Sequence, residues 1–290
     1  MSGIRHLRAE PLADVGGALL EGPTWDPASG QVRFVDIPRR RLHAFDLGRE
    51  VLMTFAVEET TTAWLPWRDG SALATRSGLR LVAGDVGADP GRLAVPIEPD
   101  LPTNRSNDAK CDPAGRMWMG TMADDESEGA GALYRVDPDL RCTRVLDALT
   151  ISNGMGWSAD GRRMWFVDSP TRRIDELAYD PGTGEASDRR PWVDLSAFEG
   201  VPDGLTVDTE DTVWVAMHAG AAVLAFDRRG GHVATVEVPV ARPTSCVFVG
   251  DQLDRLAIST AADAAGIGGD VYVCEPGVVG TPTVVFAGVA

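Results

Sequence analysis

One short pattern recurs six times along this 290-residue chain. In each copy a residue that we call the tip is followed four places later by an apolar residue, then by an Asp- and Gly-rich turn and a second apolar run. The copies are Glu21–Trp25, Ala63–Trp67, Asn107–Cys111, Asn153–Trp157, Asp203–Val207 and Thr244–Phe248. Successive tips lie 42, 44, 46, 50 and 41 residues apart. A repeat of about 40–50 residues in a chain of strands is typical of a four-stranded propeller blade.

The repeat therefore predicts an all-β fold, a six-bladed β-propeller of four-stranded blades around a central channel, with residues 1–290 as one domain. The third copy is the clearest, because the turn Asp112-Pro113-Ala114-Gly115 separates two runs that read as strands. Second strands are expected at Val32–Val35, Ala72–Ala74, Met117–Met119, Met164–Val167, Val213–Met217 and Leu256–Ile258.

The chain ends and two loops complete this prediction. A segment near Arg5–Ala13 is expected to pair with a C-terminal strand around Thr283–Phe286, which would close the ring and remove a sheet edge. Residues 87–91, rich in Gly and Pro, are expected to form a turn at the rim of the second blade. Residues 123–131, acidic and glycine-rich, form either a solvated connection or a lid over the mouth of the channel.

Composition limits the partners. The net charge of −16 argues against nucleic acid and anionic membranes and is compatible with a bound cation. No run approaches the roughly 18 apolar residues of a spanning helix, and the first twenty residues lack the apolar centre of a secretion signal. The four cysteines form no Cys-x-x-Cys pair and read as buried, reduced thiols. We therefore expect a cytoplasmic protein, a monomer or weak homo-oligomer, acting on a small molecule.

The tips carry the chemistry. Because they share one phase of the repeat, a propeller brings them to one end of its channel. Glu21, Asn107, Asn153 and Asp203 offer carboxylate and amide oxygens, which hard divalent cations prefer. A single Asn or Asp at a strand end is also a common turn former, but four in phase favour a shared cation site. No tip is a histidine, so a histidine-based zinc site is not predicted.

Four segments resemble a known family. Leu20–Trp25, Asn104–Asp108, Ser152–Trp157 and Pro202–Leu205 look like the signature segments of the SMP-30/gluconolactonase/regucalcin family, in order and within a match from about Leu19 to Thr260. The resemblance implies a six-bladed propeller with one divalent metal in the channel mouth. It also implies hydrolysis of sugar lactones and, in some members, of phosphotriesters.

By the same resemblance, Glu21, Asn153 and Asp203 would be the metal ligands, while Arg105 and Asn107 would contact substrate oxygens. The oxygen ligands favour Ca²⁺, with Mg²⁺, Mn²⁺ or Zn²⁺ as alternatives.

Two positions are less regular. Asp125 corresponds to an acidic lid residue that contacts substrate in some relatives. The glycine usual after Asn-Asp is Ala109 in this chain, which leaves the backbone of that turn open.

These residues suggest a mechanism. The metal would act as a Lewis acid on the lactone carbonyl, Arg105 would add a charged hydrogen bond, and Asp203 would be the general base that activates water, giving the aldonic acid. His218 is expected to be a wall residue, and no Gly-x-Ser-x-Gly elbow indicates a serine hydrolase. Two alternatives stay open: a metal-dependent phosphotriesterase with the same site, and a non-catalytic binding module stabilised by metal.

Overall fold

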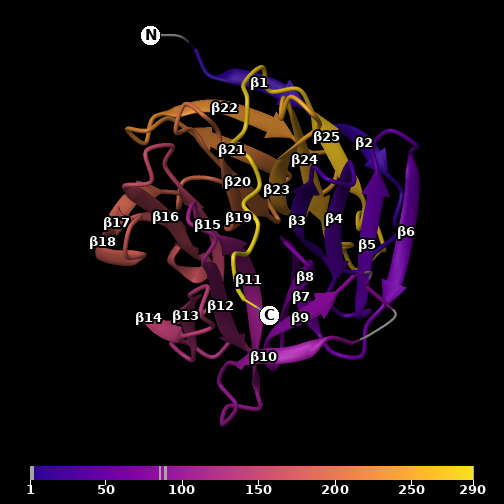
Figure 1. The fold of residues 1–290 in the computed structure, drawn as a ribbon. Coiled ribbons are helices and arrows are strands. Elements are labelled where there is room, and N and C mark those ends of the chain that lie inside the picture. Colours follow the sequence, from indigo (N-terminus) through magenta and orange to yellow (C-terminus); the bar gives the residue numbers. More distant parts are fainter. Residues whose placement is uncertain (1–2, 85, 88–89, 290) are drawn as a thin grey trace.

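The computed structural model describes residues 3–84, 86–87 and 90–289. The described residues form strands, with one short 3-10 turn at Ser169–Thr171. Six sheets stand around a common centre in a ring (Figure 1). The predicted six-bladed all-β propeller is confirmed.

Each blade begins with an innermost strand that carries a tip, and the following strands step outward. The first blade contains β3 (Leu20–Asp26), β4 (Gln31–Asp36), β5 (Arg41–Asp46) and β6 (Val51–Ala56). The second contains β7 (Thr61–Trp67), β8 (Gly70–Thr75), β9 (Gly78–Ala83) and β10 (Arg92–Pro96). The third contains β11 (Asn104–Cys111), β12 (Met117–Ala123), β13 (Gly131–Val136) and β14 (Cys142–Leu149).

The remaining blades follow the same order. The fourth contains β15 (Ser152–Trp157), β16 (Arg163–Asp168), β17 (Arg173–Asp180) and β18 (Glu185–Asp194). The fifth contains β19 (Val201–Val207), β20 (Val213–His218), β21 (Ala222–Phe226) and β22 (His232–Glu237), and the sixth contains β23 (Pro243–Val249), β24 (Arg255–Thr260) and β25 (Val271–Cys274). All six predicted second strands lie within β4, β8, β12, β16, β20 and β24.

Buried aspartates fix some of the turns between inner and second strands. Asp112 is fully buried and accepts hydrogen bonds from the backbone N–H of Arg116 at 3.0 Å and from Trp118 Nε1 at 3.1 Å. Asp208 repeats the arrangement in the fifth blade, where Trp214 Nε1 donates at 3.0 Å. One carboxylate thus satisfies a tight turn and locks the tryptophan of the next strand into the core.

The core lies between neighbouring blades. Trp25, Trp67 and Trp157, which share one phase of the repeat, are all buried. Cys111, Cys246 and Cys274 are buried free thiols, and Cys142 is exposed. No described helix is long and apolar enough to cross a membrane.

The N-terminus closes the ring, but not with the predicted partner. Strand β2 (Glu10–Ala13) pairs antiparallel with β25 and completes the sixth blade, while β1 (Arg5–Arg8) adds to the fifth blade parallel to β22. The predicted pairing with Thr283–Phe286 is therefore wrong. Pro276, Gly277 and Pro282 interrupt the chain after β25, so this segment does not form a ladder strand.

The C-terminal segment instead crosses the centre of the ring (Figure 1). Thr281 Oγ1 donates to Val207 O in the fifth blade at 3.0 Å, and the N–H of Phe286 donates to Pro66 O in the second blade at 2.9 Å. Phe286 is fully buried beside Trp67. The tail is thus a strap tied to two blades on different sides of the channel.

The two predicted loops differ in what can be described. Within residues 87–91, residues 88 and 89 lie outside the described part of the chain. The 123–131 stretch is a loop only between the end of β12 at Ala123 and the start of β13 at Gly131.

We expect Phe286→Ala to lower the free energy of unfolding by about 3–5 kcal/mol, because it removes a buried aromatic ring and leaves a cavity. Val285→Ala is the matched control, since its side chain is 44% exposed and should change stability by about 0.5 kcal/mol or less. Urea unfolding of both variants measures the difference. Equal stabilities would show that the strap is not anchored through Phe286.

Candidate functional site

Every inner strand carries a β-bulge at its tip. Pairing with the second strand shifts register at Glu21/Thr24, Thr61/Ala63, Ser106/Ala109, Ser152/Met155, Pro202/Leu205 and Pro243/Ser245. The bulges contain Asn107, Asn153 and Asp203, and Glu21 stands immediately before its own. A bulge changes the direction of the side chains that it contains, so these groups no longer follow the regular alternation of the strand.

Glycines let the bulges approach one another. Gly154 follows Asn153, and a Cβ there would stand 2.6 Å from Asp203 O. Gly22 follows Glu21, and a Cβ there would stand 2.8 Å from Thr62 O. The backbone atoms of the neighbouring inner strand have no room to yield, so only glycine permits the contact. This close approach brings tips from different blades together at one mouth of the channel.

Side-chain hydrogen bonds tie the inner strands around the ring. Thr62 Oγ1 and Ser106 Oγ lie 2.7 Å apart, Asn107 Nδ2 donates to Ser152 O at 3.0 Å, and Thr244 Oγ1 donates to Leu20 O at 2.5 Å. Neighbouring blades are therefore linked at the level of the tips.

The two tip carboxylates repel each other. Burial, followed by the charges of Asp203 and Asp108, raises the pKa of Glu21 well above its ordinary value. Burial and the charge of Asp108 do the same to the pKa of Asp203, while the neighbouring amide of Asn153 lowers it in part. Asp203 is 7% exposed, and its Oδ1 is buried with no hydrogen-bond partner among the described residues. The channel mouth therefore has too little positive charge and too few hydrogen-bond donors to balance these two carboxylates.

Asn153 is held in one orientation. Its Nδ2 donates to Ser169 Oγ at 2.9 Å, and that hydroxyl donates to Pro202 O at 2.6 Å. Because the amide nitrogen is committed to this chain, the amide oxygen is the group of Asn153 that remains for a ligand. These two hydrogen bonds end at the carbonyl oxygen of Pro202, the residue before Asp203, and so link Asn153 to the backbone beside Asp203.

Arg105 and Asn107 form a unit beside the carboxylates. Arg105 Nη1 donates to Asn107 Oδ1 and to Ser106 O, each at 2.9 Å. Burial lowers the pKa of Arg105, and the carboxylates of Asp124 and Glu21 oppose that effect. The guanidinium thus lies near Glu21, as a substrate-binding role at this site requires.

The structure does not bring Asp125 to the other predicted residues. Its side chain is exposed and accepts hydrogen bonds from the N–H and Oγ of Ser127 at 3.1 and 2.7 Å. Asp124 rather than Asp125 approaches Arg105, with 3.9 Å between its Oδ1 and Arg105 Nε, and it forms an ion pair with Arg76 Nη2 at 2.8 Å. Two adjacent aspartates in one acidic stretch cannot be told apart from the sequence alone.

Glu126, in the 123–131 loop, acts electrostatically on two residues of other strands. Its carboxylate opposes the lowering of the Arg105 pKa, in the third blade. It does the same for His218, in the fifth blade, whose pKa is lowered by burial and by Arg242. His218 is half-buried at the end of β20.

Sequence reasoning missed one charged group of the site and undervalued another. Asp108 acts electrostatically on both Glu21 and Asp203, and burial raises its own pKa while Lys110 lowers it. Lys110, the only lysine in the chain, donates from Nζ to Leu205 O at 2.7 Å. The signal was available, because both residues follow the Asn107 tip, but the repeat singled out one residue per blade.

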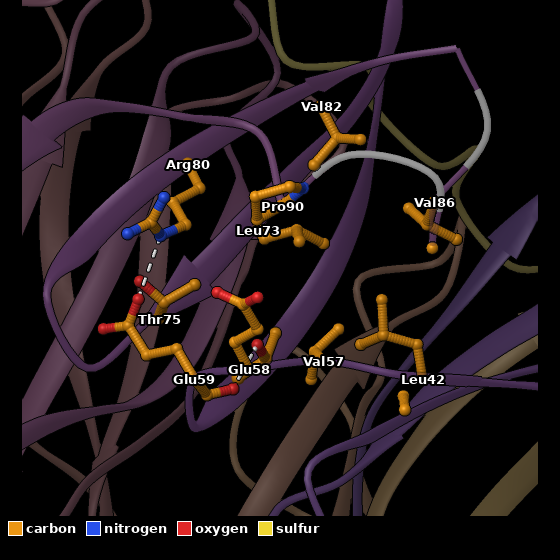
Figure 2. A pocket seen from close by; sticks show the side chains of 13 residues that line it. Leu42, Val57, Glu58, Glu59, Leu73, Thr75, Arg80, Val82, Val86 and Pro90 are labelled. Carbon is orange, nitrogen blue, oxygen red and sulfur yellow. Dashed lines mark hydrogen bonds and ion pairs between the residues drawn. The ribbon is translucent and has the colours of Figure 1, made fainter.

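A cavity of about 270 Å³ lies elsewhere, between the first two blades, and no predicted site residue lines it. Figure 2 shows the Arg80 guanidinium reaching the Glu59 carboxylate, with Leu42, Val57 and Leu73 nearby. The ion pair is 2.9 Å long. Because none of the predicted site residues lines this cavity, the channel mouth remains the candidate site.

The mouth fits a divalent cation. Among the described residues no three His, Cys, Asp or Glu side chains are grouped to share one ion. The unpaired Asp203 Oδ1 and the raised pKa values of both carboxylates are what a site prepared for a hard cation would show in its absence. Glu21, Asn153 and Asp203 would hold the ion.

Fold and mouth together define a six-bladed propeller with an acidic site at one end of its channel. Residues 19–262 match the family described as SMP-30/Gluconolactonase/LRE-like region. The chain belongs to this family.

Curated and structural relatives agree. The chain is 31% identical to regucalcin of Oryctolagus cuniculus over 283 residues, covering 92% of this chain and 94% of that protein. It is 31% identical to a putative sugar lactone lactonase of Bacillus subtilis over 254 residues, covering 87% and 86%. A crystal structure of a calcium-binding protein, regucalcin, from Agrobacterium tumefaciens superposes with a TM-score of 0.92 at 29% identity, covering 99% of each chain.

The raised carboxyl pKa values predict an unusual pH dependence for the metal-free protein. Between the unfolded pKa near 4 and the raised folded values, the folded state binds more protons than the unfolded state, so stability falls as pH rises through that interval. Asp203→Asn should flatten this decline, and Asp147→Asn, at a 72% exposed side chain, should not. Urea unfolding in a chelator across that pH range measures both, and identical slopes in all three proteins would contradict the repulsion.

Proposed function

We propose that the protein is a divalent-metal-dependent hydrolase that opens a sugar lactone to the corresponding aldonic acid. The observation that carries the proposal is the pair of mutually repelling carboxylates, Glu21 and Asp203, beside the oriented amide of Asn153. The named relatives add support, since one is a putative sugar lactone lactonase and another a calcium-binding protein.

The bound ion would polarise the lactone carbonyl as a Lewis acid. The residues of the chain do the rest. Arg105 donates a charged hydrogen bond to the carbonyl oxygen as negative charge develops there, and Asn107 holds the guanidinium in place through its Oδ1.

Asp203 moves the proton. The oxygen of water bonds to the carbonyl carbon while the Asp203 carboxylate takes a proton from that water. When the ring C–O bond breaks, the same proton passes to the leaving alkoxide, which becomes a hydroxyl of the open acid. Asp203 thus gives up within one turnover the proton that it took from water, and no other acid is required.

The arrangement favours an enzyme over a binding module. A cation that only stiffened the propeller would not require a guanidinium within electrostatic reach of a ligand carboxylate, as Arg105 is of Glu21. We further propose Ca²⁺ as the ion, a single domain formed by residues 1–290, and a cytoplasmic location consistent with four free cysteines.

We predict that Asp203→Asn lowers kcat for lactone hydrolysis by about two to four orders of magnitude, the usual contribution of a general base, while the fold is retained. Proton release from a panel of aldonolactones measures the rate, and paraoxon-like esters in the same assay test for a phosphotriesterase. Chelation should abolish turnover and Ca²⁺ should restore it. Wild-type rates in Asp203→Asn would remove Asp203 from the chemistry.

We also predict that Arg105→Ala lowers kcat/KM by about ten- to a thousand-fold, because it removes a charge-assisted hydrogen bond to the developing oxyanion. Arg8→Ala is the control, since this arginine is 80% exposed and far from the mouth in β1. If lactone hydrolysis were unaffected by Arg105→Ala, the binding-module alternative would be preferred.

A further inference from the structure

A second arginine is connected to the site through a shared carboxylate. Arg76, directly after β8 in the second blade, donates from Nη2 to Asp124 Oδ1 at 2.8 Å. The same oxygen lies 3.9 Å from Nε of Arg105, in the third blade. Burial lowers the pKa of Arg105, the charge of Asp124 opposes that effect, and the charge of Arg76 adds to it. The carboxylate thus offsets the repulsion between two guanidinium groups, and we call Arg76 and Asp124 the clamp.

Arg76 is also fixed to the backbone next to Arg105. Its Nη1 donates to Asn104 O at 3.0 Å and to Pro102 O at 3.3 Å. Asn104 begins β11 and immediately precedes Arg105. A guanidinium is a rigid planar fork, so one side chain can hold a carbonyl group and a carboxylate at a set separation. Arg76 thereby fixes the position of Asp124 relative to the backbone that carries Arg105.

The backbone holds Asp124 from the other side. Its N–H donates to Thr103 O at 2.8 Å, and the preceding Ala123 pairs with Asn104 across β11 and β12. The two side chains of the clamp are 34% and 47% exposed. Ion pairs as exposed as this one add little to stability. Loss of the clamp is therefore expected to change the orientation of Arg105 and to leave the fold intact.

The contacts of Arg105 leave one of its nitrogens for a ligand. Nε faces Asp124, and Nη1 donates to Asn107 Oδ1 and to Ser106 O. Nη2 has no hydrogen-bond partner among the described residues, and it is not enclosed by the protein. When a planar guanidinium is held at two of its nitrogens, the direction of the third is fixed. The clamp and Asn107 together therefore determine where Nη2 donates.

We propose that Arg76 and Asp124 are positioning residues, which orient Arg105 so that its Nη2 donates to the carbonyl oxygen of the lactone. The clamp touches no reacting atom and acts through Arg105 alone. The identity of the ligand rests on the proposed function, whereas the restraint that the clamp places on Arg105 can be measured without any substrate.

The first experiment measures that restraint on the full chain in Ca²⁺. The heteronuclear NOE of the Arg105 Nε–H group reports its motion on the picosecond to nanosecond timescale, and its signal is the one lost in Arg105→Ala. We expect the NOE to fall by about a third in Arg76→Ala and in Asp124→Asn. Thermal melts confirm that each variant is folded. An unchanged NOE in both folded variants would overturn the proposal.

Arg68→Ala is the matched control for this experiment. It removes an exposed ion pair with Asp69 from the same blade, but this pair precedes β8 whereas Arg76 follows it. The Arg105 NOE and the rate of lactone hydrolysis should both keep their wild-type values in this variant. A fall in the NOE equal to that in Arg76→Ala would contradict a specific clamp.

A double-mutant cycle then tests whether the clamp acts through Arg105. Arg76→Ala should lower kcat/KM for lactone hydrolysis about tenfold in the wild type, and by less than about twofold in the Arg105→Ala background. A tenfold loss in both backgrounds would give Arg76 a separate role and overturn the proposal. If the wild type hydrolysed no aldonolactone, the proposed function would fail, while a fall in the Arg105 NOE would still support the clamp.

Discussion

The chemistry of this propeller depends on one extra residue in each innermost strand. A regular ladder would alternate side chains between the two faces of a blade and point none of them along the channel. The bulges at Asn107, Asn153 and Asp203 break that alternation where the strands reach the mouth. Gly154, directly after its tip, then lets the next strand approach closely enough for the tips to meet.

The price of this convergence is electrostatic. Burial raises the pKa of the Glu21, Asp203 and Asp108 carboxyls, and the charge of Asp108 raises the pKa of Glu21 and Asp203 further. Lys110 and Arg105 offset part of that charge from opposite sides. A fold selected only for stability would have no use for such a cluster, and a divalent cation would convert mutual repulsion into shared ligation. The electrostatic repulsion between the carboxylates of the site is therefore an argument for a function.

The repeat could be read from the sequence because turn residues and apolar runs recur with the blade, and this placed all six inner and second strands. The way the ring closes could not be read from the sequence. No local pattern distinguishes β25 from the tail segment across the channel as the pairing partner of β2. The tips were identifiable by phase. Asp108, within the same bulge as Asn107, was passed over because the repeat singles out one residue per blade. The ion pair of Asp124 with Arg76 could not be identified, because it depends on how the loop turns against a neighbouring blade.

The most direct test of the central claim is anomalous diffraction from crystals soaked in Mn²⁺, whose scattering locates the ion without any assumption about activity. We predict a single strong peak per chain, in contact with the carboxylates of Glu21 and Asp203 and the amide oxygen of Asn153. A peak elsewhere, or none at this mouth at saturating Mn²⁺, would contradict the account.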